Sequence, residues 1–349
     1  MFTLTACDQG GSKGKVTEPG KTITIIEEHK QEENEAEISV QKVERFEQVT
    51  ITDWLDEDTV IVSKENESLG KMSLAELSDQ YPTSLYLLEI HSKEYQLVKE
   101  QKDVLLGGAV FSKDKKYLLY HEFVLGDPAF FVMNLDNKES FGIMGEPIGG
   151  AMSAHWADHD TVTGAAYSGG AYLADKTGNI NLIDDLNGEA IFLVEKIDDV
   201  IYYNTQSDFT LMKLNLDTKE KTSLKLEQVY NILPSPDHKQ LLILQSNGSK
   251  GSMLVYDLES GEKVVIAEGT EVYGVSWSPD QRMVAYSMKE DENTSTIRSL
   301  YVYDMLTGTS TKMAVNTEIL SVNWSPSGEK LSYSEWDGEQ YISTIITLK

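Results

Sequence analysis

One short pattern recurs seven times along the chain, at intervals of 38 to 57 residues. It consists of an aromatic or apolar anchor, a polar turn and an apolar strand-like run, and two sharp copies are Ser-Trp-Ser-Pro-Asp at 276–280 and Asn-Trp-Ser-Pro-Ser-Gly at 323–328. The anchors are residues 54, 111, 156, 196, 234, 277 and 324, and four of the five tryptophans occupy this position. Pro and Asp or Ser are the residues that β-turns favour, so each copy predicts a strand–turn–strand hairpin.

A second pattern, a strand ending in a polar hairpin, repeats with the same period. Clear copies are Tyr-Asp-Leu-Glu-Ser-Gly-Glu at 256–262 and Tyr-Asp-Met-Leu-Thr-Gly-Thr at 303–309. Its reference positions are 93, 138, 178, 219, 261 and 308, with intervals of 40 to 47 residues. Two hairpins in each 40–50 residues give four short strands per repeat, which is typical of a β-propeller blade.

The two patterns together predict an all-β fold, a seven-bladed β-propeller of four-stranded antiparallel blades. The first hairpin occurs seven times and the second six times, which leaves the last blade without an outer strand. A strand-like segment near Glu37–Val43 can fill that place, which would close the ring and cover an exposed sheet edge. A six-bladed ring is the alternative if the weak fourth copy, at Glu195–Asp199, is not a repeat.

The Trp-Ser-Pro-Asp pattern resembles the WD40-like propeller repeat of the TolB-like superfamily. The resemblance covers most of the chain in its period and is sharpest in the last three copies. It implies an architecture and no particular activity, because propellers with this repeat serve many functions.

The N-terminal residues resemble a bacterial lipoprotein signal. Leu-Thr-Ala-Cys at 4–7 matches a lipobox, a polar stretch follows it, and the resemblance implies a lipid attached to Cys7 at the mature N-terminus. Only three residues precede the box, so the signal peptide is truncated and its basic and apolar part would lie upstream. Residues 1–36 are interpreted as lipobox remnant and flexible acidic tether, and 37–349 as the propeller domain. If the box is a chance match, the chain is a cytoplasmic propeller.

Charge and cysteine content exclude several classes of partner. The 30 Lys and Arg against 57 Asp and Glu give a net charge of −27 and a pI near 4.5, which argues against nucleic acid and against direct docking on anionic lipid. One cysteine excludes an internal disulfide, and no apolar run is long enough to span a membrane. We therefore expect a monomer, lipid-anchored outside the bacterial cell membrane, with the membrane contacted through the anchor only and an unknown protein or cell-envelope ligand as partner.

In such propellers the four strands of a blade are labelled a to d from the channel outward, and the two repeat patterns are the a–b and c–d hairpins of one face. A binding site is expected on the other face, formed by the b–c and d–a connections, because these vary between repeats while the hairpins are regular. The first b–c connection runs from Ser63 to Ser84 and contains a capping-box pattern, Ser-Leu-Ala-Glu at 73–76, which predicts a short helix. The candidate binding residues on this face are Glu122, Tyr167, Tyr203, Glu335 and Trp336.

The sequence contains no catalytic motif, and we predict no catalytic residue, no metal site and no cofactor. His155, Asp158, His159 and Asp160 cluster, but they surround a repeat tryptophan and its turn, so we interpret them as structural. The favoured hypothesis is a non-catalytic binding or protein-interaction scaffold. The alternative is a propeller hydrolase or lyase that acts on a sugar or peptide at the channel mouth.

Overall fold

A computed structural model describes residues 15–18, 21–24, 38–292, 295–315 and 319–349. The chain divides into two compact units, Met1–Ser39 and Val40–Lys349. In the first unit β1 (Lys15–Glu18) pairs antiparallel with β2 (Lys21–Thr24), within the segment that we interpreted as a flexible acidic tether. Cys7 lies outside the described residues.

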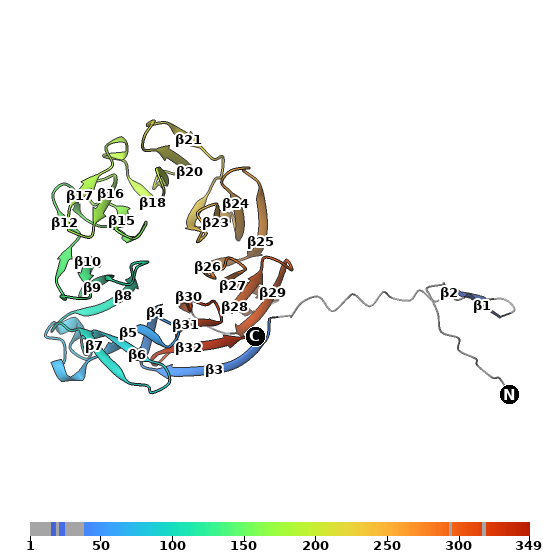
Figure 1. The fold of residues 1–349 in the computed structure, drawn as a ribbon, viewed down its shortest axis with the longest axis horizontal. Helices are drawn as coiled ribbons and strands as arrows, with labels where there is room; N and C mark the ends of the chain where they lie inside the picture. Colours follow the sequence, from blue (N-terminus) through green and yellow to red (C-terminus); the bar gives the residue numbers. More distant parts are fainter. Residues whose placement is uncertain (1–14, 19–20, 25–37, 293–294, 316–318) are drawn as a thin grey trace. The chain divides into compact units, whose positions relative to one another are not determined.

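The second unit is a β-propeller, as the repeats predicted. Figure 1 shows its strands grouped in a ring, and the described strands form seven four-stranded antiparallel groups. One parallel bridge, between Thr83 and Leu105, joins the first two groups into a single sheet. The six-bladed alternative required a misread fourth copy, but the residues of that copy form part of a regular four-stranded group.

The strands of the first four blades follow the predicted order a, b, c, d. Blade 1 contains β4 (Val49–Trp54), β5 (Thr59–Glu65), β6 (Thr83–Glu89) and β7 (Tyr95–Lys99). Blade 2 contains β8 (Leu105–Phe111), β9 (Tyr117–Phe123), β10 (Ala129–Asn134) and β11 (Ser140–Gly142). Blade 3 contains β14 (His155–Trp156), β15 (Thr161–Ala165), β16 (Ala171–Asp175) and β17 (Ile180–Leu182). Blade 4 contains β18 (Ile191–Ile197), β19 (Val200–Thr205), β20 (Asp208–Asn215) and β21 (Lys221–Ser223).

The remaining blades have longer strands. Blade 5 contains β22 (Val229–Pro234), β23 (Gln240–Asn247), β24 (Lys250–Asp257) and β25 (Lys263–Gly269). Blade 6 contains β26 (Glu271–Trp277), β27 (Met283–Glu292), β28 (Ser295–Asp304) and β29 (Thr309–Val315). Blade 7 contains β30 (Ile319–Trp324), β31 (Lys330–Trp336), β32 (Tyr341–Leu348) and, as its outer strand, β3 (Val40–Glu47).

The connections hold the other short elements. A two-stranded hairpin of β12 (Met144–Gly145) and β13 (Gly149–Gly150) joins blades 2 and 3. The 3-10 helices are η1 (Glu67–Leu69), η2 (Ala75–Leu77) and η3 (Asp184–Leu186). The capping-box prediction is wrong in its detail. Leu74 occupies the N-cap of η2 without a side-chain hydrogen bond, while the backbone N–H of Ser73 donates to Asp103 Oδ1 at 2.6 Å.

The repeat tryptophans join each blade to the one before it. The indole Nε1–H of Trp324 donates to the carbonyl of Ser276 at 3.1 Å, and that of Trp156 donates to Val110 at 3.0 Å. Trp277 reaches Leu233 in the same way at 3.4 Å. In each case the acceptor is the residue just before the anchor of the preceding repeat. Tryptophan suits this position because its large apolar ring fills the core between two blades and its N–H supplies one hydrogen-bond donor.

A buried serine organises the turn of the first hairpin. Ser278 Oγ donates to Asp280 Oδ1 at 2.6 Å and accepts the backbone N–H of Met283 at 2.8 Å. The equivalent serines of other blades, Ser112, Ser235 and Ser325, are also buried. In the second hairpin, Asp257 Oδ1 accepts the backbone N–H of Ser260 at 2.8 Å. Both patterns therefore mark turns whose backbone donors are satisfied by a short polar side chain.

Closure of the ring follows the predicted arrangement. β3 pairs antiparallel with β32 over the register from Val40–Leu348 to Glu47–Ile342. A serine network buried beside this blade connects it to blade 1: the backbone N–H of Ile51 donates to Ser343 Oγ at 2.9 Å and to Ser334 Oγ at 3.0 Å. Hydrophobic clusters fill the spaces between consecutive blades, so each sheet is buried on both faces.

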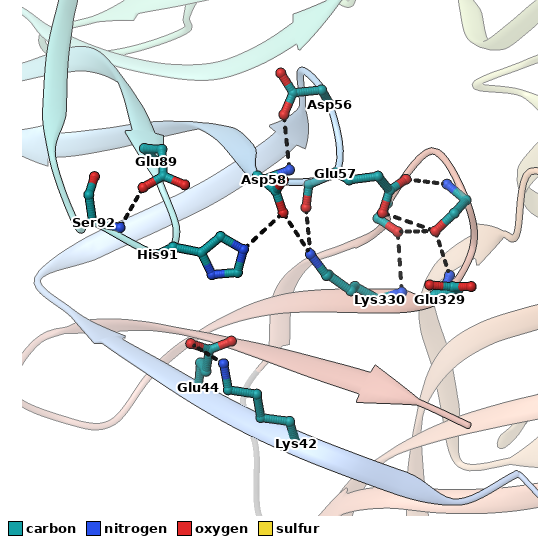
Figure 2. A network of polar contacts seen from close by, with 12 residues as sticks. Lys42, Glu44, Asp56, Glu57, Asp58, Glu89, His91, Ser92, Glu329 and Lys330 are labelled. Carbon is teal, nitrogen blue, oxygen red and sulfur yellow. Dashed lines mark hydrogen bonds and ion pairs between the residues drawn. The ribbon is translucent and has the colours of Figure 1, made fainter.

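An exposed polar network also spans the junction of blades 7 and 1 (Figure 2). Lys330 Nζ donates to the carbonyl of Glu57 at 2.7 Å and lies 3.2 Å from Asp58 Oδ1, which also contacts His91 Nε2 at 3.1 Å. The Glu57 carboxylate accepts the Ser327 hydroxyl at 2.9 Å. Because exposed ion pairs stabilise a fold by at most about 1 kcal/mol each, the buried serines and the β3–β32 pairing hold the ring closed.

Candidate functional site

A cleft of about 640 Å³ opens where blades 7, 1 and 2 meet. The inner strand β4 of blade 1 contacts β30 of blade 7 and β8 of blade 2, which brings the three blades together (Figure 1). Side chains at the ends of β5, β9 and β31 and in the connection 66–82 line the cleft. It therefore lies on the face of the b–c and d–a connections, where we predicted the site.

One wall carries an exposed aromatic pair. Trp336 and Tyr341 face each other across the β31–β32 hairpin, with ring centroids 4.8 Å apart and planes inclined at 62°. Their exposed fractions are 39% and 48%. Asp337 fixes the connecting turn, because its Oδ1 accepts the backbone N–H groups of Glu339 and Gln340, both at 2.9 Å. The pair is thus held on a short, well-bonded hairpin and presents aromatic surface to solvent.

A second group of aromatic lining residues consists of Tyr81, His121 and Phe123. The His121 ring packs directly over Gly107 and Gly108, and a Cβ added to Gly108 would lie 2.4 Å from His121 Nδ1. Gly108 has φ +57°, a conformation that glycine adopts without strain. Burial lowers the pKa of His121, so the imidazole is neutral at pH 7.

The floor is polar and internally bonded. Thr52 Oγ1 donates to the carbonyl of Ala109 at 2.7 Å, and Ser63 Oγ and Thr83 Oγ1 both donate to the carbonyl of Leu106, at 2.5 and 2.8 Å. These bonds join β4, β5 and β6 to β8. They fix the base of the cleft, so its shape is set by the blades and not by loops alone.

Long polar side chains surround the rim. Gln48, Gln80, Glu339 and Gln340 line the cleft, and Gln48, Gln80 and Glu339 are exposed. Among the described residues, no hydrogen bond or ion pair given by the structure uses these four side chains. Their amide and carboxylate groups are therefore open to a ligand.

Of the five candidate residues, Trp336 lines the cleft. Glu335 precedes it on β31 and is half-buried, and burial raises the pKa of its carboxyl while Arg45 partly opposes the rise. Glu122 lies between two lining residues without lining the cleft, and its carboxylate accepts the Gln101 side chain at 3.2 Å.

The other two candidates lie in different blades. Tyr167 is 49% exposed and its hydroxyl donates to Asp127 Oδ2 at 2.6 Å. Tyr203 is only 5% exposed and belongs to the hydrophobic core with Ile201 and Leu214, so its ring packs within the protein and is not presented on the surface. The structure does not bring the five candidates together.

Sequence reasoning missed most of the cleft. Tyr341, Tyr81, His121 and Gln340 come from three blades, and only the closed ring brings them together. The signal that was available for Tyr341 is its position opposite Trp336, five residues later across a predicted hairpin. His121 and Tyr81 carried no signal, because aromatic residues are common in strands.

The His-Asp cluster of blade 3 has structural partners. His155 Nε2 lies 3.1 Å from Glu195 Oε2, Lys196 Nζ lies 3.4 Å from Asp158 Oδ2, and Lys176 Nζ lies 2.6 Å from Asp160 Oδ1. Within the part of the chain that the structure describes, no group of three or more His, Cys, Asp or Glu side chains is arranged to hold a metal ion. Nor does any helix there have the length and apolarity needed to cross a membrane.

Comparison with known proteins supports the fold. No protein-family model and no curated protein matches the sequence. Among solved structures, an oligogalacturonate lyase from Vibrio parahaemolyticus aligns with TM-score 0.65 and 11% identity, over 89% of this chain and 98% of that one. The Cps50 (Swd1) β-propeller domain of Myceliophteria thermophila gives 0.60 and 11%, over 90% and 100%. TolB from Acinetobacter baumannii gives 0.50 and 12%, over 83% and 63%. The chain thus has a TolB-like, WD40-like propeller fold.

Proposed function

We propose that this protein is a non-catalytic propeller scaffold that binds an envelope ligand in the cleft between blades 7, 1 and 2. The observation that carries the proposal is the Trp336–Tyr341 pair, which stays exposed although it lies on a hydrogen-bonded hairpin at the rim of a cleft. Exposed aromatic residues beside unpaired polar groups are typical of binding sites.

We further propose that the protein acts outside the cell membrane, held there by a lipid on Cys7. The lipobox resemblance and the likeness of the fold to TolB support this location. Two acyl chains on one cysteine suffice for stable anchoring. Mass spectrometry of the N-terminus of protein isolated from its own cells tests the anchor: a diacylglyceryl group on Cys7 is expected, and an intact Met1 would contradict it.

The binding function is tested with full-length protein carrying Cys7→Ser, so that no lipid can retain it. The protein with an unchanged cleft and the protein that also carries Trp336→Ala are each incubated with isolated envelopes of the organism that encodes the chain. The fraction of each protein that binds is then measured. We expect the substitution to lower retention about tenfold. Phe192→Ala is the matched control, because Phe192 is 44% exposed in blade 4 and does not line the cleft. Equal retention of Trp336→Ala and wild type would refute binding through the cleft.

An enzyme is the second candidate function. The observation in its favour is His121, a cleft-lining imidazole whose lowered pKa leaves it unprotonated at pH 7, as a general base requires. Because the fold is similar to that of an oligogalacturonate lyase, cleavage of oligogalacturonate is the reaction to test. We expect no unsaturated product when the protein is incubated with oligogalacturonate. Turnover that disappears in His121→Ala would establish the enzyme instead.

A further inference from the structure

We infer that the ligand of the cleft is an uncharged sugar chain. This inference rests on the proposed function, because it assumes that the cleft is the binding site. Three properties of the cleft lead to it: exposed aromatic surface, unpaired amide and carboxylate groups, and a small net charge.

The aromatic wall fits the apolar face of a pyranose ring. A pyranose carries C–H groups on its two faces and hydroxyl groups around its edge, so it stacks on an aromatic ring while its edge stays free for hydrogen bonds. Trp336 and Tyr341 present such surface on a hairpin whose turn is fixed by Asp337. Since the rings are held in place before binding, little side-chain entropy is lost when a ligand stacks on them.

The polar rim requires a ligand with many hydroxyl groups. The side chains of Gln48, Gln80, Glu339 and Gln340 offer both donors and acceptors, and no described hydrogen bond uses them. An apolar ligand would remove these groups from water without replacing the lost hydrogen bonds, which weakens binding. Each sugar hydroxyl both donates and accepts, so a sugar chain can pair with all four.

Charge disfavours an acidic sugar. The charged side chains that line the cleft are those of Lys64, Glu65 and Glu339, and His121 is neutral, so the cleft has a net charge of −1 at pH 7 on a chain of net charge −27. A uronate or phosphate chain would meet repulsion from both. The inferred ligand therefore differs from oligogalacturonate, the acidic sugar chain in the name of the lyase that has the same fold.

The test uses the full-length Cys7→Ser protein and titration calorimetry. The probes are cellohexaose, maltohexaose and hexa-N-acetylchitohexaose as uncharged chains, trigalacturonate as an acidic chain, and a trilysine peptide as a basic chain. We expect at least one uncharged chain to bind, and the acidic and basic chains to bind at least about tenfold more weakly.

Variants identify the surface that is used. Trp336→Ala should weaken binding of the uncharged chain about tenfold, while Trp336→Phe, which keeps an aromatic ring, should stay within about threefold of wild type. Phe192→Ala should bind as wild type does. Trp336 is exposed, so these substitutions leave the fold intact, and thermal unfolding of each variant verifies this.

Three results would overturn the inference: no uncharged chain binds, the acidic or basic chain binds more tightly, or Trp336→Ala binds the sugar unchanged. The envelope-retention experiment separates this failure from failure of the proposed function. If retention depends on Trp336 but no uncharged sugar binds, the cleft binds another class of ligand and only the present inference is wrong. If retention does not depend on Trp336, the proposed function itself is wrong.

Discussion

The indole Nε1–H of Trp54, in the first blade, donates to Ser332 Oγ of the last blade at 3.0 Å, and Trp54 is 1% exposed. The same N–H lies 3.3 Å from the carbonyl oxygen of Asn323. Trp54 thus makes the inter-blade bond of the other repeat tryptophans, but between residues about 270 positions apart in the chain. This bond belongs to the closure of the ring.

Replacing Trp54 with phenylalanine should destabilise the ring. Phenylalanine keeps much of the packing but cannot donate to Ser332 or Asn323, so we expect a loss of about 1–3 kcal/mol in unfolding free energy. Urea unfolding followed by circular dichroism measures the change. Trp336→Phe serves as control, because Trp336 is exposed and its substitution should shift the midpoint very little. Equal midpoints for Trp54→Phe and wild type would show that the indole bond contributes nothing to closure.

Removal of β3 should open blade 7. Without residues 1–47, β32 keeps β31 but loses its outer antiparallel partner, and the edge that contains Ile342 and Ile345 becomes exposed. Unpaired edges promote aggregation, so we expect a lower melting temperature and concentration-dependent association in light scattering. A chain beginning at residue 38 retains β3 and should melt as the full-length protein does. If both truncated chains melt alike, the β3–β32 pairing does not stabilise the ring.

Stability should depend on pH through His155 and Glu195. Burial acts to lower the pKa of His155, but the Glu195 carboxylate at 3.1 Å outweighs it, and the pKa lies above its ordinary value of 6.5. Because folded His155 binds its proton more tightly than unfolded His155, the pair stabilises the fold fully below about pH 6.5 and loses this contribution as pH rises through the raised pKa.

The measurement is the imidazole titration of His155 by NMR, together with unfolding free energies on either side of pH 6.5. Glu195→Gln removes the charge and keeps the shape, so it should lower the pKa of His155 and flatten the pH dependence. A His155 pKa at or below 6.5 in the wild-type protein, or the same pH dependence in the variant, would contradict the prediction.

A methyl group at Gly108 should disturb the cleft. In Gly108→Ala the new Cβ would lie 2.4 Å from His121 Nδ1, and φ +57° adds backbone strain, so the His121 ring must move. Gly308→Ala is the matched control: Gly308 has φ +70°, like Lys219 (φ +63°) at the equivalent place of another hairpin, and the added Cβ would meet only the Tyr303 hydroxyl at 3.7 Å, an ordinary contact. We expect Gly108→Ala to lower the melting temperature more than Gly308→Ala and to shift the NMR signals of His121. Identical melting temperatures of the two variants would show that the His121 ring moves aside without loss of stability.

The repeats made the fold predictable because each motif residue has one local physical task. The tryptophan supplies an inter-blade donor, as in Trp324, and the serine of the turn satisfies backbone donors, as in Ser278. Each of these two tasks recurs in four of the seven blades, so the motif residues recur in the sequence. The missing outer strand was likewise predictable, since six copies of one hairpin against seven of the other leave one edge unpaired.

The cleft was not predictable to the same degree. Its walls combine Tyr81, His121 and Tyr341 from three blades, and nothing in the sequence places those residues together before the ring closes. Tyr203 shows a second reason. Both faces of each blade pack against neighbours, so alternation along a strand does not separate buried from exposed side chains, and the ring of Tyr203 lies in the core. Trp336 is the last residue of β31, at the tip of a short hairpin, where it stays exposed.

The pairing of β3 with β32 has a consequence for biosynthesis. During translation β3 is made before any blade, and its partner β32 is made after all the other described strands. The early strand must therefore remain without its sheet while six blades form behind it, and closure brings together segments about 300 residues apart, a slow, high-contact-order step. Until β32 emerges, β3 and β31 both lack the strand that lies between them. During this interval a chaperone or an export factor can pair with these unpaired strands.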